Sequence, residues 1–535
     1  MSNVLGFIGK KQNSFLASDS AEDFLVVFKG NIENGEELKK WLAEEGLLTE
    51  GEATTTKLLV QTVKYYYKGK LEETIKDVLD KVQGIFTLGV FTKQEPGKVV
   101  AVTKDSSLVI GLGDENNFIA SDIISLLPYT KKCMLINSKE VCVLTPEEIK
   151  VTTISGEIAS KEIFDVSWNG ADKGSYEHFM LKEIEEQPAG FRTNLSGRVV
   201  NNQVKFESLT LSSEIVNRWK KIFIVACGTS YHAGLIGKGV FESLLHIPVE
   251  VEIASEFSYR GPLINKDTLV IVISQSGETA DTLAALREAK SKGASVLAIT
   301  NVLTSTIGRE SDYSVYIWSG PEIAIASTKA FTAMLLVEYL LALYIGQIKG
   351  TVGDTQAKEI IGALFALPDL AAKILNSTEQ YEKIAQKYKE HTNAFFLGRG
   401  FDWPLSLEGA LKLKETSYVH AEGYPAGEFK HGSLALVTDD TFIIALCVQK
   451  NTYEKTLANV KECRARGAKV LAIALEGDKE VTQYVDDVIY LPKVNNFIAP
   501  ILTVIPLQLL AYNISKARGC NVDQPRNLVK SIVIE

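Results

Sequence analysis

Short apolar runs separated by turn residues fill the first third of the chain. Five of these runs predict β-strands, at Phe24–Phe28, Ile85–Phe91, Val99–Val102, Leu108–Gly111 and Cys133–Ile136. One longer stretch, Leu58–Lys81, has helical spacing and interrupts the series. After Glu147 the chain becomes polar, and Ser175–Pro188 predicts a helix that Pro188 closes. Residues 1–150 are therefore predicted to form an α+β domain, and 151–208 a connector.

The pattern changes near Leu209, where apolar runs begin to alternate with helical stretches. Two strand–helix–strand units follow one plan, over 267–300 and 440–474, and a further strand precedes each unit, at 221–228 and 393–400. Such alternation predicts parallel sheets flanked by helices, and the repetition predicts a duplicated α/β domain. The two halves are expected at 209–365 and 366–520, with a polar tail at 521–535.

The two most apolar stretches, Ala333–Gly346 and Phe497–Tyr512, are both interrupted. Glu338 lies in the first and Pro506 in the second. A membrane helix needs about 20 predominantly apolar residues, so both stretches are predicted to be core elements, with no membrane partner. Met1–Lys11 lacks the charged and apolar regions of a signal peptide, which favours a cytoplasmic protein.

Composition narrows the classes of function. The 535 residues include 57 Lys and Arg and 66 Asp and Glu, which gives a net charge of −9. Without a basic block, this balance argues against a nucleic-acid partner. The six cysteines form no CxxC pair and the six histidines no HExxH motif. No metal or other cofactor is therefore expected, and the cysteines are expected to be reduced and mostly buried.

The segment Ser274–Thr279, SQSGET, lies between a predicted strand and a predicted helix. It supplies three hydroxyls and one amide, from Ser274, Ser276, Thr279 and Gln275. Serine and threonine also cap ordinary helices, but so dense a group at a helix N-terminus favours a phosphate site. The second repeat has Val448–Asn451 in the same place, without the serines, which predicts one phosphate site per chain.

Three other segments carry candidate chemistry. The loops Gly228–Ala233 and Ala324–Lys329 each precede a predicted helix, and each is also compatible with ordinary capping. Glu408, Lys412 and Glu415 have the spacing of one helix face, which fits either a solvated salt-bridge row or a catalytic group. The amine of Lys530, near the C-terminus, could form an imine with a carbonyl substrate.

Six motifs in order, CGTS, SQSGET, ASTKAFT, EGALKLKE, EFKHG and QPRNLVKS, carry a resemblance that covers nearly the whole chain. The sequence resembles the glutamine–fructose-6-phosphate aminotransferases, also called glucosamine-6-phosphate synthases. The resemblance implies an α/β fold of two tandem sugar-isomerase (SIS) domains with parallel sheets flanked by helices. An N-terminal-nucleophile (Ntn) type glutaminase-like α+β domain would precede them.

The resemblance also implies roles for the candidate residues. Ser274, Gln275, Ser276 and Thr279 would hold the phosphate of fructose 6-phosphate, and the sugar would contact Thr229, Ser230, Ser327 and the backbone of Val529. Lys530 would form the imine, and Glu415, helped by Lys412, would move a proton between C1 and C2. His431, donated by a neighbouring subunit in this family, would open the sugar ring. That sharing implies a homodimer or a higher homo-oligomer.

The N-terminal third departs from the family pattern. Family members begin Met-Cys-Gly, whereas Ser2 and Asn3 stand at these positions here, and the arginine-bearing stretches RGYDSAG and HTRWATHG are missing. Lys29 replaces the oxyanion-stabilising asparagine, and Thr55 replaces the aspartate that would hold the amino group of glutamine. Loss of an oxyanion donor alone costs several kcal/mol of transition-state stabilisation. Residues 1–150 are therefore predicted to be a shortened, degenerate and inactive glutaminase-like domain.

These departures predict a glutamine-independent enzyme of amino-sugar metabolism. It would interconvert fructose 6-phosphate and ammonia with glucosamine 6-phosphate, as an aminating isomerase or deaminase. Three alternatives stay open at this point. The chain could be another SIS enzyme, such as a fructosamine-6-phosphate deglycase, or a non-catalytic sugar-phosphate sensor. It could also remain glutamine-dependent, with Ser2 as the nucleophile.

Overall fold

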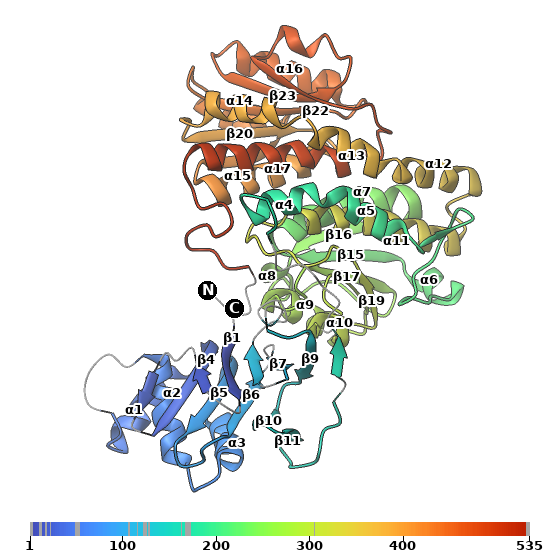
Figure 1. Ribbon diagram of the computed structural model, residues 1–535. Coiled ribbons are helices and arrows are strands. Elements are labelled where there is room, and N and C mark those ends of the chain that lie inside the picture. The colour runs from blue at the N-terminus through green and yellow to red at the C-terminus, as the bar shows by residue number, and fades with distance from the viewer. Residues whose placement is uncertain are drawn as a thin grey trace. The chain divides into compact units, whose positions relative to one another are not determined.

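The computed structural model describes residues 4–9, 13–15, 19–21, 23–48, 54–104, 108–114, 116–120, 126, 129–161, 163–165, 173–303 and 305–530. The chain divides between residues 172 and 173 into two compact units. Figure 1 shows the first unit in blue to teal and the second in green to red. The division falls inside the predicted connector, so that 151–208 contributes elements to both units.

The first unit contains two six-stranded antiparallel sheets. One has the order β12-β9-β7-β8-β1-β2, with β1 (Val4–Gly9), β2 (Asn13–Phe15), β7 (Leu108–Leu112), β8 (Asn116–Ala120), β9 (Lys132–Ile136) and β12 (Ile163–Asp165). The other has the order β11-β10-β6-β5-β4-β3, with β3 (Asp19–Ala21), β4 (Phe24–Ile32), β5 (Gly84–Thr92), β6 (Val99–Lys104), β10 (Glu140–Leu144) and β11 (Ile149–Thr153). All five predicted strands are confirmed.

In the sheet that contains β6, successive side chains point to opposite faces, and each face packs against a different layer of this unit. Val100 and Val102 pack with the helices, whereas Val99 and Ala101 join the core between the two sheets. Side chains that alternate between faces are what an extended strand requires. The helices are α1 (Gly35–Glu44), α2 (Thr55–Tyr66) and α3 (Leu71–Lys81). The single helix predicted over Leu58–Lys81 is thus two helices, with Gly69 at φ +97° in the turn between them.

The second unit begins with α4 (Phe179–Glu185) and α5 (Gln187–Leu195). Pro188 lies in the first turn of α5 instead of closing the predicted helix. The first turn of a helix has no N–H partners to lose, so proline is tolerated there and starts α5. A short hairpin of β13 (Val199–Val200) and β14 (Gln203–Val204) and the helix α6 (Ser213–Arg218) lead into the first repeat.

Two five-stranded parallel sheets with one topology form the body of this unit. The first has the order β16-β15-β17-β18-β19, with β15 (Lys221–Ala226), β16 (Val249–Ile253), β17 (Thr268–Ser274), β18 (Ser295–Thr300) and β19 (Tyr313–Tyr316). The second has the order β21-β20-β22-β23-β24, with β20 (Asn393–Gly398), β21 (His420–Pro425), β22 (Phe442–Cys447), β23 (Lys469–Leu475) and β24 (Asp487–Leu491). The repeat detected in the sequence is therefore a structural duplication.

Helices cover both faces of each sheet. In the first repeat they are α7 (Gly228–Leu245), α8 (Ala254–Phe257), α9 (Ala280–Ser291), α10 (Thr306–Glu310) and α11 (Lys329–Lys349). In the second they are α15 (Asp402–Ser417), α16 (Tyr453–Arg464) and α17 (Ala499–Ala517), with the 3-10 helices η2 (Glu428–His431), η3 (Ser433–Leu436) and η4 (Val481–Gln483). In chain order, the two repeats are connected by α12 (Asp354–Phe365), α13 (Leu367–Leu375) and α14 (Thr378–Tyr388). Figure 1 shows α16 on one face of the second sheet and α15 and α17 on the other.

The two longest apolar helices, α11 and α17, join the repeats through one shared core. The hydroxyl of Tyr339 donates to the carbonyl of Phe497, and Gln508 Nε2 donates to the carbonyl of Thr328 at 3.1 Å. Within the described residues, α11 is long and apolar enough to cross a membrane, but 83% of its most apolar window is buried inside the protein. Both stretches are thus core elements, as predicted. Four of the six cysteines are also buried, and all six are free thiols.

Candidate active site

The order of the strands in the first repeat locates a ligand crevice. The chain passes from β15 outward to β16 and then returns to the other side of β15 as β17. In open α/β sheets, ligands bind beyond the carboxyl ends of the strands where the order reverses in this way. The loop that opens α7 follows β15, and the loop Gln275–Thr279 follows β17. Two of the predicted binding loops therefore leave the two central strands at one edge of the sheet.

The loop after β17 is organised as an anion site would require. Ser274 Oγ accepts the N–H of Gly277 at 3.0 Å and lies 2.9 Å from the hydroxyl of Thr279. Gly277 has φ +66°, and a Cβ there would lie 2.2 Å from Ser305 Oγ, so this turn requires glycine. The turn gathers these hydroxyls at the N-terminus of α9, where the helix dipole favours an anion. Ser276 and Gln275 lie in the same turn.

The corresponding strand end of the second repeat already holds a buried carboxyl group. Asp402 is 1% exposed, and its Oδ2 accepts the N–H groups of Val448 and Gln449, both at 3.1 Å, just beyond β22. Burial raises the pKa of this carboxyl to about 7. A side chain of the protein thus occupies the backbone donors that a phosphate would use in this half. The segment Val448–Asn451, which lacks the serines of the first repeat, therefore has an acceptor for two of its backbone N–H groups within the protein.

A buried charge cluster connects the two repeats at the start of α7. Lys412 Nζ lies 2.6 Å from Glu415 Oε2, 3.1 Å from Thr229 Oγ1 and 3.6 Å from Glu408 Oε1. Glu408 Oε1 also accepts the hydroxyl of Thr229 at 3.1 Å, and its Oε2 lies 2.7 Å from Nδ1 of His232. The side chains of Glu408 and Lys412 are 0% and 1% exposed. The spacing along α15 therefore marks a buried network and not a solvated salt-bridge row.

The cluster keeps Lys412 charged. Burial alone would lower its pKa, but the carboxylates of Glu415 and Glu408 outweigh burial and raise the pKa above its ordinary value. The negative field of Glu322 adds to theirs. Glu415 remains 22% exposed, so one carboxylate of the network faces the solvent side. Lys412 can thus orient Glu415 and supply a fixed positive charge beside it.

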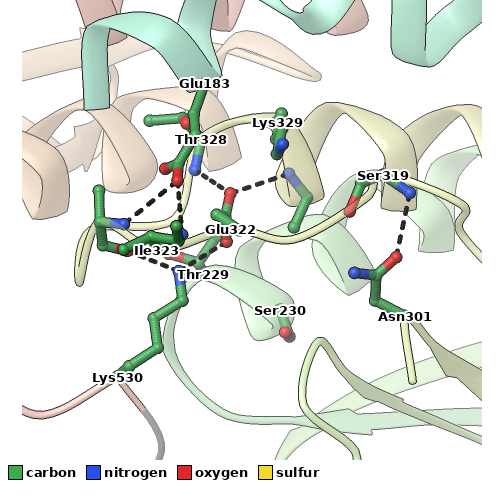
Figure 2. A network of polar contacts seen from close by, with 12 residues as sticks. Glu183, Thr229, Ser230, Asn301, Ser319, Glu322, Ile323, Thr328, Lys329 and Lys530 are labelled. Atoms are coloured by element: carbon green, nitrogen blue, oxygen red, sulfur yellow. Dashed lines mark hydrogen bonds and ion pairs between the residues drawn. The ribbon is translucent and has the colours of Figure 1, made fainter. Parts of the chain in front are cut away.

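Lys530 lies against the segment Glu322–Thr328, which directly precedes α11 (Figure 2). Its Nζ donates to Glu322 Oε2 at 2.8 Å and to the carbonyl of Ala324 at 2.7 Å. Glu322 is fully buried, and its Oε1 accepts the N–H groups of Thr328 and Ala330 at 2.8 and 3.0 Å. Burial would raise the pKa of Glu322, but Lys530 and these N–H groups lower it. The amine is thus anchored to an ionised carboxylate.

The remaining predicted residues differ in their contacts. Ser230 Oγ lies 3.7 Å from the sulfur of Met334. Ser327 Oγ is buried and has no hydrogen-bond partner among the described residues. A buried hydroxyl normally has such a partner, so this one is available to a polar ligand. Val529 is 67% exposed. His431 ends η2, is exposed, and makes no hydrogen bond or ion pair with any residue that the structure describes.

Sequence reasoning missed His232 and Glu322, which support this site, and it missed the burial of Glu408. Glu408 was visible through its spacing to Lys412, but its burial was not. His232 lies in the predicted segment Gly228–Ala233, in the first turns of α7, but nothing in the sequence singles it out. Glu322 shows no local signal, because its partner Lys530 is 208 positions away. In the N-terminal third, Lys29 lies on β4 and Thr55 begins α2; Ser2 and Asn3 are outside the described residues.

Comparison with known proteins matches the chain to one family model, to curated relatives and to solved structures. The SIS domain family matches residues 215–344 and 387–515. A glutamine–fructose-6-phosphate aminotransferase [isomerizing] of Clostridium tetani is 48% identical over 527 residues, 98% of this chain and 86% of the relative. The C-terminal domain of glucosamine-fructose-6-phosphate aminotransferase from Francisella tularensis is 39% identical with a TM-score of 0.63, over 66% of this chain and all of that one. A glucosamine-6-phosphate deaminase of Thermotoga maritima is 26% identical with a TM-score of 0.51, over 66% of this chain and 99% of that one.

These matches confirm the predicted fold class of two SIS domains after an α+β domain with antiparallel sheets. They also correct the predicted activity. The curated relatives that match across both units are named for glutamine, so the prediction of a glutamine-independent, ammonia-dependent deaminase is wrong. The replaced motif residues and missing stretches of the N-terminal third do not outweigh similarity that extends through 98% of the chain.

Proposed function

Since the chain belongs to the family of glutamine–fructose-6-phosphate aminotransferases, we propose that it converts fructose 6-phosphate and glutamine into glucosamine 6-phosphate and glutamate. The observation that carries the proposal is 48% identity to a relative named for this reaction, over 98% of the chain. The comparisons themselves support an enzyme of this family with two SIS domains. The substrate, the amino donor and the residue roles below are the proposal.

The sugar phosphate would bind across the edge of the first SIS sheet. Ser274, Ser276, Thr279 and Gln275 would hold the phosphate at the N-terminus of α9, with hydroxyls already gathered there. Thr229, Ser230, Ser327 and the backbone of Val529 would bind the sugar hydroxyls. The unpartnered buried hydroxyl of Ser327 supports this assignment. Asp402 supports a single phosphate site, because it fills the equivalent place in the second repeat.

The chemistry would begin at Lys530. Its neutral amine adds to the C2 carbonyl of open-chain fructose 6-phosphate, and loss of water gives an imine. Ammonia released from glutamine then displaces the lysine from C2. Glu415 takes a proton from C1 and returns one to C2, so that a 2-amino aldose phosphate leaves. The ammonium group of Lys412, 2.6 Å from Glu415, would stabilise the charge that develops during this transfer.

The amino donor can be tested directly. Purified protein is given fructose 6-phosphate with glutamine labelled with ¹⁵N in its amide, and glucosamine 6-phosphate is analysed by mass spectrometry. The label is expected in the product. Ser2 stands where the family has its nucleophilic cysteine, so Ser2→Ala is expected to abolish labelled product and Ser2→Cys to retain it. Product that forms from ammonium but never from glutamine would overturn the proposed donor.

The exposure of His431 supports a role in a second copy of the chain. We place it in the active site of a neighbouring subunit, where it would open the sugar ring. His431→Ala and Glu415→Gln are each expected to be inactive alone. When the two are unfolded and refolded together in equal amounts, about one quarter of the wild-type sites should contain both intact residues in a C₂ dimer. Recovery of activity to about that level is expected, and its absence would show that each chain uses its own His431.

A further inference from the structure

Three ionisable residues from distant parts of the chain meet around the segment before α11 (Figure 2). Glu183 comes from α4, Glu322 from the segment itself, and Lys530 from the C-terminal tail. The two carboxyls are close enough for Glu322 to raise the pKa of Glu183. One ammonium thus faces two carboxyls in a buried environment, where the number of protons they hold sets the local charge.

The two carboxyls have different hydrogen-bond partners. Both oxygens of Glu322 are used, one by Lys530 and one by N–H groups at the start of α11. Glu183 is 2% exposed, and its Oε1 accepts the N–H groups of Ile323 and Ala324. Its Oε2 is buried and has no hydrogen-bond partner in the described part of the chain. A bare carboxylate oxygen in that position would be costly, so the geometry favours a proton on Glu183.

The charges around Glu183 agree with the geometry. Burial, and next the carboxylate of Glu322, raise its pKa to about 8, although Lys530, the N–H of Ile323 and Lys329 act in the opposite direction. Lys329 is itself paired with Glu186 at 2.5 Å, which weakens its influence on Glu183. A carboxyl whose pKa is raised in this way is neutral below that pH and becomes charged above it. Near neutral pH the group facing Lys530 therefore carries one negative charge, on Glu322.

The peptide that Glu183 holds is the one that orients the amine. Glu183 accepts the N–H of Ala324, and the carbonyl of Ala324 accepts Lys530 Nζ at 2.7 Å. A lysine must lose its proton before it attacks a carbonyl. A second negative charge beside it would hold that proton more tightly. Glu183 therefore has two effects on Lys530, one through the backbone and one through charge.

We propose that Glu183 is a positioning residue for Lys530, which holds the Ile323–Ala324 backbone as a neutral acid and suppresses imine formation when it ionises. This inference rests on the proposed role of Lys530 as the imine-forming amine. Nothing in the sequence marks Glu183 for this role, since it lies in the connector, 347 positions before Lys530 (530 − 183).

The test uses the full-length protein with fructose 6-phosphate and no glutamine. Borohydride reduces any imine to a stable adduct, which mass spectrometry locates on Lys530. The amount of adduct in Glu183→Gln relative to wild type is expected to rise about 3- to 10-fold between about pH 7 and pH 9, because only the wild type gains the second charge. Glu183→Ala loses both backbone contacts, and its adduct is expected to fall about 10-fold or more at every pH.

A matched control lies on the same helix. Glu185 accepts the hydroxyl of Tyr176 and forms no hydrogen bond or ion pair with the segment before α11 among the described residues. Glu185→Gln is expected to match the wild type at every pH. A Glu183→Gln to wild-type ratio that stays constant with pH would reduce Glu183 to a structural role and overturn the proposal.

A second readout separates this inference from the proposed function. Labelling of Lys530 by an amine-reactive probe, without any sugar, reports its neutral fraction as a function of pH. The midpoint is expected at lower pH in Glu183→Gln than in the wild type. A shifted midpoint with no borohydride adduct in any variant would refute the imine and leave the coupling of Glu183 to Lys530 intact. An unshifted midpoint would refute the coupling itself.

Discussion

Replacing Glu415 by glutamine is expected to lower kcat by about 10²- to 10⁴-fold, the contribution of a positioned general base. Glutamine keeps the size of the side chain and its contact with Lys412, but it cannot accept a proton from C1. The measurement follows exchange of the C1 proton of fructose 6-phosphate with deuterated water by NMR. This half-reaction needs no amino donor, so it isolates the isomerase site from any effect on glutamine.

Binding should separate this loss from general damage. The KM for fructose 6-phosphate is expected to stay within about threefold of the wild type, because Glu415 acts in the transition state and not in the phosphate site. Glu382→Gln, on the exposed face of α14, is the matched control and is expected to exchange the C1 proton at the normal rate. Normal exchange in Glu415→Gln would remove this residue from the role of base.

Replacing Lys412 by methionine is expected to destabilise the second unit by about 3–5 kcal/mol, the cost of breaking a buried ion pair from one side. Lys412 is 1% exposed and faces two carboxylates, Glu408 and Glu415. Methionine fills similar volume but leaves the buried charge of Glu408 to His232 and Thr229 alone. The check is equilibrium unfolding in urea, with the free energy of unfolding compared between variant and wild type.

Lys414 provides the reference for this measurement. It lies on the same helix with its side chain exposed, so Lys414→Met is expected to change the free energy of unfolding by no more than about 0.5 kcal/mol. An equal free energy of unfolding for Lys412→Met and Lys414→Met would mean that removing the ammonium partner of Glu408 does not destabilise the fold. The cluster would then have no net electrostatic contribution to folding.

The predicted activity shows where motif reasoning fails. Ser2, Lys29 and Thr55 differ from the family pattern, two arginine-bearing stretches are missing, and together these departures predict the loss of the glutaminase reaction. Single motif residues report on one reaction step each. Identity of 48% over 527 residues reports on the whole chain, and the relatives that carry it are named for glutamine.

The sequence by itself determined the duplicated α/β body and the hydroxyl-rich loop after β17. Strand-length apolar runs that alternate with helices leave little choice of architecture, and the hydroxyl-rich loop Ser274–Thr279 forms within six consecutive residues. Local patterns of this kind depend on neighbours in the chain, so they can be read from it. The break between α2 and α3 and the role of Pro188 were harder to predict, since both depend on where a turn falls between packed helices.

Only the tertiary structure decided which charges are buried and which residues face one another. Glu408, Lys412 and Glu415 have the same spacing in a solvated row as in a catalytic cluster, and it is the packing of α15 against α7 that removes Glu408 and Lys412 from water. Lys530 reaches Glu322 across 208 positions, and Glu183 reaches Ala324 across 141. No periodicity links such residues. Their energies of interaction depend on burial and on distance in space, and both quantities exist only after the chain has folded.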